Sequence, residues 1–403
     1  MSKTREVRKS IVVDTTPELA FEALTGAGEL REWCSDQAWT EVRPGGRYEV
    51  RWNSGYRADG KFTELDPPHR AAVTWRGTGE PGESAVEFTV RPITGGVEVT
   101  IRHHGFGPGA EWDEVVKASE EGWSEGVENL KSTLETGVDL RRTRQPFLGI
   151  NLDLLTPKRA AEEGIAAGQG IYVLDTVEGS GARAAGLVKG DVIVALAGKE
   201  TPGFGELGAA LRACRAGDVV DVELVRGQER MTVKATLGSR PQREVPATAA
   251  ELADLLAQQH AQVNAELQAA VEGVTEAEAE RQPAEGEWSA KQTLAHLTEG
   301  ERGFHLILVN MALNGWLDGG PVYPDQIPGR LDAVLAVTPT LQGLVERFIT
   351  DQAETAAIVR GLPETTVAHK ARFRRIAELC LASPDHAREH IEQIKQAIAA
   401  ARA

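Results

Sequence analysis

The chain has 403 residues, of which 41% are hydrophobic and 26% are charged, and its formal net charge is −16. This length predicts several domains, and the composition excludes a fibrous or wholly disordered protein. Acidic residues outnumber basic ones in each of the three domains proposed below, so the chain offers no basic surface, and we expect no nucleic-acid partner.

Three sequence features bear on the cellular location. No apolar run approaches the roughly 18 residues of a membrane span, so we expect no membrane partner. The first ten residues, MSKTREVRKS, contain no apolar stretch of the kind found in export signals. Cys34, Cys214 and Cys380 lie far apart and share no metal-binding or redox spacing. These features predict a cytoplasmic protein with reduced thiols.

Two short polar segments, residues 141–146 and 238–246, divide the chain. Each combines proline with clustered charge and lacks strand or helix periodicity, as linkers do. We therefore predict a multidomain α+β protein with three different domains, at residues 1–140, 145–238 and 245–403.

The first domain combines strand-like runs with two helices. A strand over residues 7–13 precedes a helix that begins at Pro17, and residues 112–136 have an apolar stripe at helical spacing. Because this long helix must cover one face of the sheet, we predict an α/β sandwich in which a curved sheet wraps the helix. A cavity between helix and sheet would take a small apolar ligand, unless the tryptophans fill it as core. The strand-like runs between the helices are residues 48–52, 71–75, 85–90 and 97–101.

Several landmarks follow one another in this domain: Trp33, Arg43–Gly46, Gly60–Leu65, Val73–Trp75 and His103–Phe106. Their order resembles the activator homologues of the heat-shock-protein ATPase, which have a START-like helix-grip fold (the SRPBCC superfamily). The resemblance implies a ligand cavity but does not identify the ligand.

The second domain has short strands and one longer helix, residues 204–214. Near its start, Phe147, Leu148, Gly149 and Ile150 form a loop whose glycine allows backbone N–H groups to converge on a peptide carboxylate. The strand after the loop would pair with an added peptide, and Leu211 would form a wall of the groove. The order of these features closely resembles a PDZ domain of the bacterial HtrA type, with a β-barrel-like fold.

The PDZ resemblance implies peptide or protein C-termini as partners, held by Phe147, Leu148, Gly149, Ile150 and Leu211. The alternative is a purely structural PDZ domain in which Leu148 and Ile150 are ordinary strand residues. Proteolysis does not follow from the resemblance, because the glycine-rich segments of the chain lack nucleophile-elbow spacing.

The third domain has the pattern of an all-α four-helix bundle. The last helix would begin at Ser383, with its hydroxyl as the cap and Pro384 in the first turn. The connection after the second helix contains a run rich in glycine and proline at residues 319–324. The predicted helices are residues 248–273, 289–314, 331–361 and 383–401.

Three histidines of this domain have metal-binding spacing. His386 and His390 lie one helical turn apart, and His296 lies early in the second predicted helix. If these helices are neighbours, three imidazoles converge and leave a fourth coordination position open, as in a catalytic zinc site. Among divalent transition metals zinc is expected first, and nickel, iron and manganese also fit. The alternative is unrelated histidines, and we expect His305 and His369 to be of that kind.

The runs Glu287–Ser289, Ala295–Leu297 and Asp385–Ile394 are similar to the DinB superfamily, which includes thiol-dependent isomerases and S-transferases. The resemblance places the metal on His296, His386 and His390 and implies a low-molecular-weight thiol as a cofactor. Residues 386–390 also spell H-x-x-E-H, but that protease motif needs a ligand well downstream, and only a short tail of the sequence follows.

Two functions follow for the chain. In the first, the bundle is a metal-dependent thiol S-transferase or hydrolase, coupled to a peptide-binding PDZ domain and a START-like ligand pocket. In the second, the chain is a non-enzymatic ligand- and peptide-binding adaptor or stress-response protein. Glu299, near His296 on the same helical face, is a weak candidate for a general base, and a solvated surface carboxylate is the alternative. The sequence leaves open whether any substrate is turned over.

Overall fold

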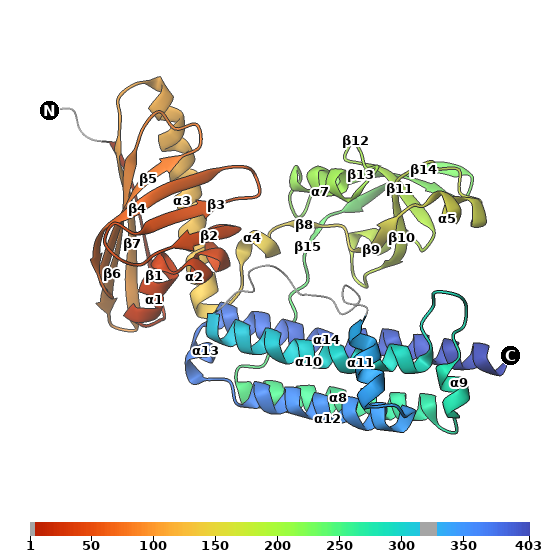
Figure 1. Cartoon of the computed structure of the whole chain (residues 1–403). Coiled ribbons are helices and arrows are strands. Elements are labelled where there is room, and N and C mark those ends of the chain that lie inside the picture. The colour runs from red at the N-terminus through yellow and green to blue at the C-terminus, as the bar shows by residue number, and fades with distance from the viewer. Residues whose placement is uncertain (1–4, 315–328) are drawn as a thin grey trace. The chain divides into compact units, whose positions relative to one another are not determined.

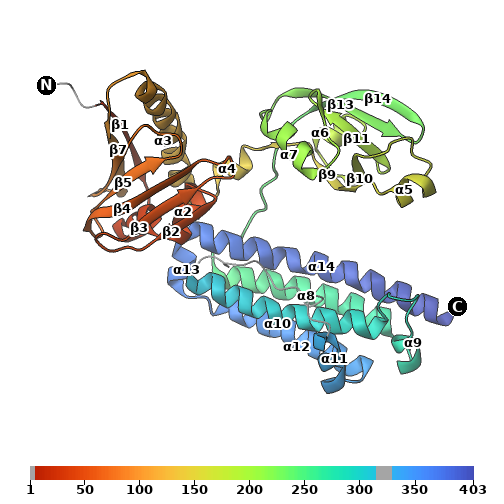
Figure 2. The same ribbon diagram turned by 45° about the horizontal axis from the view of Figure 1, so that its top comes forward.

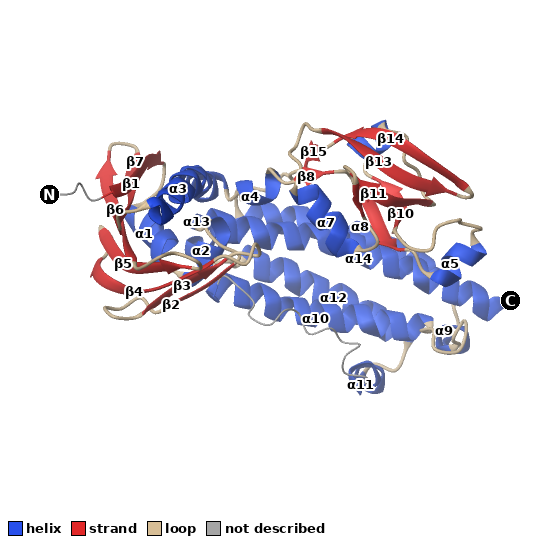
Figure 3. Cartoon of the chain, turned by 90° about the horizontal axis from the view of Figure 1, so that it is seen from above, coloured by secondary structure: helices blue, strands red, loops and turns tan. Residues whose placement is uncertain are grey.

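The computed structural model describes residues 5–314 and 329–403. Its contacts divide the chain into two compact units: unit 1 comprises Met1–Val138 with Glu244–Ala403, and unit 2 comprises Asp139–Arg243. The described residues form a sheet with a covering helix, then a sheet-rich segment, then a helical segment (Figures 1 and 3). The boundaries of the three domains stay a prediction. The run rich in glycine and proline at residues 319–324 lies outside the described residues.

The N-terminal part of unit 1 is a seven-stranded antiparallel sheet with the long helix α3 (Ala110–Thr136) against it (Figure 1). Its strand order is β1-β7-β6-β5-β4-β3-β2. The sequence did not predict the short elements α2 and β2, nor strand β4, which was noted only as a family landmark over Gly60–Leu65. The other elements are β1 (Arg5–Val13), α1 (Pro17–Thr25), α2 (Ala27–Trp33), β2 (Gln37–Thr40), β3 (Arg47–Arg51), β4 (Arg57–Asp66), β5 (Arg70–Gly77), β6 (Ser84–Ile93) and β7 (Gly96–Phe106).

Aromatic side chains pack between α3 and the sheet. The Trp123 ring centroid lies 5.7 Å from that of Trp75 and 6.5 Å from that of Phe88. The Trp123 indole N–H donates to Nδ1 of buried His103 (3.2 Å), so His103 Nε2 carries the proton and donates to the Ser84 hydroxyl (2.8 Å). Burial lowers the pKa of His103 to about 3, which keeps this ring neutral. These tryptophans therefore act as core.

Unit 2 is built on a sheet in which the strand order is β14-β13-β11-β10-β9, with β12 paired to β11. Because β9 (Ile150–Leu154) is last in this order, one of its edges is paired with no strand among the described residues. Helix α7 (Phe204–Arg212) packs Leu207 and Ala210 into the core. The other elements are α4 (Leu140–Thr143), β8 (Pro146–Phe147), α5 (Pro157–Glu162), β10 (Ile171–Thr176), α6 (Gly181–Ala184), β11 (Asp191–Leu196), β12 (Lys199–Glu200), β13 (Val219–Arg226), β14 (Glu229–Thr236) and β15 (Gly238–Ser239).

The C-terminal part of unit 1 is a helical bundle (Figure 2). Helix α10 packs on α12 and α14, and α8 packs on the same two helices. Among the described helices, none combines the length and apolarity that a membrane crossing requires. The long helices are α8 (Ala249–Val271), α10 (Ala290–Asn314), α12 (Leu341–Arg360) and α14 (Lys370–Arg402); the short ones are α9 (Glu276–Glu280), α11 (Gly329–Val337) and α13 (Glu364–Ala368).

The predicted start of the last helix at Ser383 is wrong, because α14 begins at Lys370 and contains Pro384 in its interior. A proline at this position cannot donate to the Cys380 carbonyl, four residues earlier. The Ser383 hydroxyl donates to that carbonyl instead (2.9 Å). The lost backbone bond is thus replaced by a side chain, and the helix continues through a sequence that is typical of a helix start.

The predicted helix over 331–361 is also wrong in one respect, since the structure divides it into α11 and α12. Pro339 lies in the break, and the Thr340 hydroxyl begins α12 by accepting from the Gly343 N–H (3.1 Å). The apolar pattern continues across the break because Val334 of α11 packs into the same core as α12.

A buried polar layer crosses the bundle between two apolar clusters, one containing Leu252 and Phe373 and the other Val263 and Ile391. Three layer residues form a chain of hydrogen bonds. The His305 Nε2 donates to the Thr355 hydroxyl (2.8 Å), which donates to the Glu301 carboxylate (2.7 Å). Glu301 and Thr355 are both buried.

Burial raises the pKa of Glu301 above its usual range. The titratable groups that face it are His305, Asp351 and Cys380. A raised folded-state pKa stabilises the fold below the unfolded pKa, and this contribution is lost as pH rises through the folded-state pKa.

We therefore expect the Glu301→Gln variant to match the wild type in stability near pH 4 and to exceed it near pH 8. Urea unfolding, followed by the helical circular dichroism signal at both pH values, measures this difference. A stability difference between the two proteins that does not change with pH would contradict the expectation.

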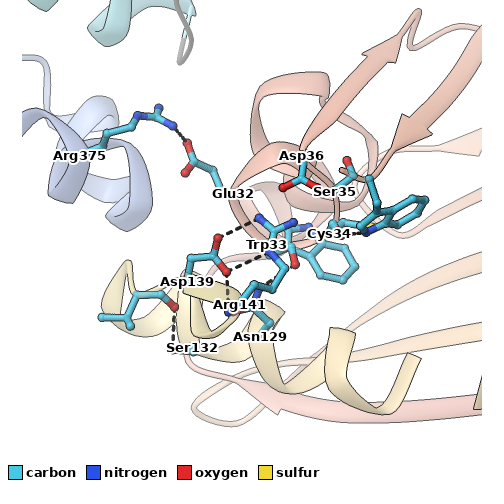
Figure 4. A network of polar contacts seen from close by, with 12 residues as sticks. Glu32, Trp33, Cys34, Ser35, Asp36, Asn129, Ser132, Asp139, Arg141 and Arg375 are labelled. Atoms are coloured by element: carbon cyan, nitrogen blue, oxygen red, sulfur yellow. Dashed lines mark hydrogen bonds and ion pairs between the residues drawn. The ribbon is translucent and has the colours of Figure 1, made fainter. Parts of the chain in front are cut away.

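Within unit 1, acidic residues of α1 and α2 pair with basic residues at the start of α14. The pairs are Glu22 with His369, Glu29 with Arg372 and Glu32 with Arg375, the last of which is drawn in Figure 4. His369 is therefore engaged in a hydrogen bond with Glu22, and it lies outside the histidine cluster described next.

Candidate functional site

Three histidines from two neighbouring helices meet at one point of the bundle. His296 comes from α10, and His386 and His390 come from α14. One ring nitrogen of each can serve as a ligand atom, and these atoms all lie within 4.8 Å of one another. The ring centroid of His390 lies 4.5 Å from that of His386 and 4.8 Å from that of His296. The structure thus brings together the three residues that the sequence selected.

Two neighbours favour the ligand form of these rings. Gln393, one turn after His390 on α14, accepts through its amide oxygen from His390 Nδ1 (2.8 Å). The proton is thereby held on Nδ1, and the lone pair is left on Nε2 for a metal. Partial burial, and then the neighbouring His390, lower the pKa of His386. Burial and the neighbouring His390 both favour the neutral imidazole of His386, which is the form that binds metal.

The donor set fits a divalent transition metal. Three imidazole nitrogens match zinc, nickel, iron or manganese and leave a coordination position for a reactant. Among the described residues, no carboxylate or thiolate completes this cluster as a fourth protein ligand. A closed structural site would have such a ligand, so the arrangement is that of an open site.

A pocket of about 460 Å³ lies beside the cluster. His390 and Gln393 line one wall, and Trp288, from the segment before α10, lines another. The Trp288 ring also lies against His296, with 4.9 Å between the ring centroids. The sequence contained Trp288 as part of a family motif, but neither its contact with His296 nor the pocket was predicted.

Glu299 is neither free nor a solvated surface residue. It is buried and forms an ion pair with Arg330 of α11. This pairing engages the carboxylate away from a role as a general base. His305, which the sequence predicted to be an ordinary histidine, belongs to the polar layer and lies outside the cluster.

The predicted peptide-binding loop lies at the start of edge strand β9. Gly149 has φ of +84°, a conformation that favours glycine. Its carbonyl accepts from the Val177 N–H (2.9 Å) and the Ser180 hydroxyl (3.1 Å), and the Leu148 carbonyl accepts from the Ala182 N–H (2.9 Å). Because C=O and N–H point in opposite directions in a trans peptide, the N–H groups of Gly149 and Ile150 point away from Val177–Ala182.

The other predicted groove residues have different environments. Leu148 is buried in the core of unit 2, whereas Ile150 and Leu211 are partly buried against that core. Phe147 is partly buried, and its backbone pairs with Gly238 of β15. Leu148 is therefore a core residue, Gly149 is buried beside it, and the edge of β9 that no described strand pairs is the part left for an added peptide.

Comparison with known families gives three separate matches. Residues 14–135 match the family described as activator of Hsp90 ATPase homolog 1-like protein, residues 146–237 match the PDZ domain, and residues 259–394 match the DinB superfamily. Each match covers one segment of the chain, in the order that the sequence predicted. The fold is accordingly an α/β sheet segment, a PDZ segment and a helical DinB segment.

Individual relatives resemble parts of the chain. The serine protease Do-like HtrA of Bacillus subtilis is 28% identical over 123 residues, which are 28% of this chain and 27% of that protein. The chain thus spans about a quarter of that relative's length. Two solved structures resemble a part of the chain. One is protein MLL2253 from Mesorhizobium loti, with 23% identity and a TM-score of 0.30, and the other is the Aha1 dimer from Colwellia psychrerythraea, with 20% identity and a TM-score of 0.29. Each match covers 32% of this chain and 96% of the chain in that structure.

Proposed function

We propose that the bundle binds one divalent transition metal, zinc first, through His296, His386 and His390, and that the metal centre acts on a small thiol. The observation that supports this proposal is the convergence of three ring nitrogens within 4.8 Å, drawn from two helices. The DinB resemblance of this segment adds the expectation of thiol chemistry.

A metal at this site would supply a Lewis acid that favours the deprotonated form of a thiol or of water. The chain's own residues would orient the histidine rings that bind the metal. Gln393 holds the proton of His390 on Nδ1 and so orients the ring. The Trp288 ring lies against His296 and so limits the orientations open to that ring.

The thiol reaction is tested with 2-mercaptoethanol and an aryl chloride that carries nitro groups. In the expected transfer, an S–C bond forms, the C–Cl bond breaks with its electron pair leaving as chloride, and the thiol proton passes to buffer. Full-length protein purified without chelator should accelerate this reaction, and removal of the metal should abolish the acceleration. Metal-loaded protein with no acceleration for any thiol or hydrolysable ester would contradict the proposal.

We also propose that the middle domain binds the free C-termini of peptides or proteins. The support is that the N–H groups of Gly149 and Ile150 both point away from the segment that holds their neighbouring carbonyls. Two such donors suit a carboxylate, and the free edge of β9 suits an extended peptide. For the helix-grip segment we propose no ligand, because its aromatic side chains pack against one another.

A second candidate function is that of an adaptor that binds metal and peptides without turnover. The observation in its favour is the ion pair of Glu299 with Arg330, which engages the one carboxylate that the sequence offered as a general base. The two candidates differ in one result: an adaptor would hold stoichiometric metal and show no metal-dependent thiol transfer.

A further inference from the structure

We propose that the pocket beside the histidine cluster selects ligands by charge, accepting neutral or cationic thiols and rejecting those with an anionic tail. This inference rests on the proposed metal function and adds the substrate class. It concerns the end of the ligand that does not touch the metal.

Three parts of the chain line the pocket, of which α10 contributes Thr293. The segment before α10 contributes Glu287 and Trp288, and the last turns of α14 contribute His390, Gln393 and Gln396. The volume of about 460 Å³ suits a small molecule. Because His390 and Gln393 are part of the wall, a ligand in the pocket lies next to a metal ligand and also meets Glu287 and Gln396.

The charges of the wall are unbalanced. Glu287 is acidic, and none of the described residues that line the pocket is a lysine or an arginine. A metal ion offsets the negative charge of a thiolate bound to it, but a second anionic group in the pocket would lose water without gaining a cationic partner. A neutral or cationic tail avoids this cost, and a cation gains attraction to Glu287.

The uncharged part of the wall favours the same ligands. The Gln393 amide oxygen is used by His390, which leaves its NH₂ group as a donor toward neutral acceptors. The indole of Trp288 offers an apolar face, which also attracts cations. The wall therefore combines one anion, amide groups and an aromatic ring.

The test uses three thiols of similar size: cysteamine with a cationic tail, 2-mercaptoethanol with a neutral tail, and thioglycolate with an anionic tail. Their binding to cobalt-loaded full-length protein is followed by calorimetry and by the visible absorption of the cobalt. The thiols differ in intrinsic acidity, so their affinities cannot be compared directly within one protein. The measured quantity is therefore the ratio of cysteamine affinity to thioglycolate affinity, and this ratio is compared between variants.

The variants are Glu287→Gln and Glu287→Lys, with Glu285→Gln as a matched control from the same segment that does not line the pocket. We expect Glu287→Gln to lower the ratio of cysteamine to thioglycolate affinity by about tenfold, the combined effect on the two oppositely charged tails of one exposed charge at roughly 10 Å in a medium of effective dielectric about 50. Glu287→Lys should lower it further, and Glu285→Gln should leave it within about twofold.

Two negative results have different meanings. If wild-type protein takes up no metal, the proposed metal function fails, and the inference that rests on it fails as well. If the protein binds cobalt and thiols but the ratio does not respond to Glu287, or responds equally to Glu285, the charge selection alone is overturned.

Discussion

Replacing His386 or His390 with alanine is expected to weaken metal binding at least about 100-fold while the bundle stays folded. Loss of a residue that only supports a metal ligand typically costs 10–100-fold, and loss of a ligand itself costs more. Neither side chain contributes to the apolar clusters of the bundle, so its removal opens no core cavity. Metal content after dialysis, and competition with a chelator of known affinity, measure the effect.

His305→Ala and His369→Ala provide the controls for this prediction. Both histidines lie in the same unit but outside the cluster, with hydrogen bonds or ion pairs of their own. Their variants should keep wild-type metal content even where stability falls. Full metal retention by His386→Ala, or equal loss in His305→Ala with helical content intact, would refute the metal site.

The histidine cluster was predictable because it depends on local rules. His386 and His390 are four residues apart, and any helix there places them on one side. The single non-local requirement was that α10 and α14 be neighbours, which a four-helix bundle satisfies easily. The motif residue Trp288 was visible in the sequence too, but its contact with His296 requires the fold of the preceding segment.

Two of the errors share a physical cause, since each depends on a side chain whose partner periodicity does not show. Ser383 and Pro384 have the pattern of a helix start, yet Ser383 donates to the carbonyl that Pro384 cannot reach, and α14 runs through. Glu299 has the spacing of an exposed residue near His296, yet Arg330, distant in sequence, pairs with it. Helical periodicity contains no information about either partner.

The second large effect is expected for Gly149→Ala, which should weaken the binding of peptides with a free C-terminus at least about tenfold. A Cβ at this position would lie 2.1 Å from Ser180 Cβ and 2.6 Å from Ser180 Oγ, so the loop must shift. The backbone conformation adds a cost of about 1–2 kcal/mol for any residue with a side chain. Calorimetry on the full-length chain, with matched free and amidated peptides ending in a hydrophobic residue, measures the change.

Gly179→Ala separates the steric contact from the backbone cost. Gly179 has φ of +72° in the turn that holds the Gly149 carbonyl, but a Cβ there would meet no atom within 4 Å. This variant should therefore lose stability by a similar backbone cost and keep its peptide affinity. Amidation of the peptide should weaken its binding to the wild type, because the N–H groups of Gly149 and Ile150 then lose a charged acceptor. Equal affinities for the free and amidated peptides would rule out carboxylate capture at this loop and leave the free edge of β9 as the remaining peptide contact.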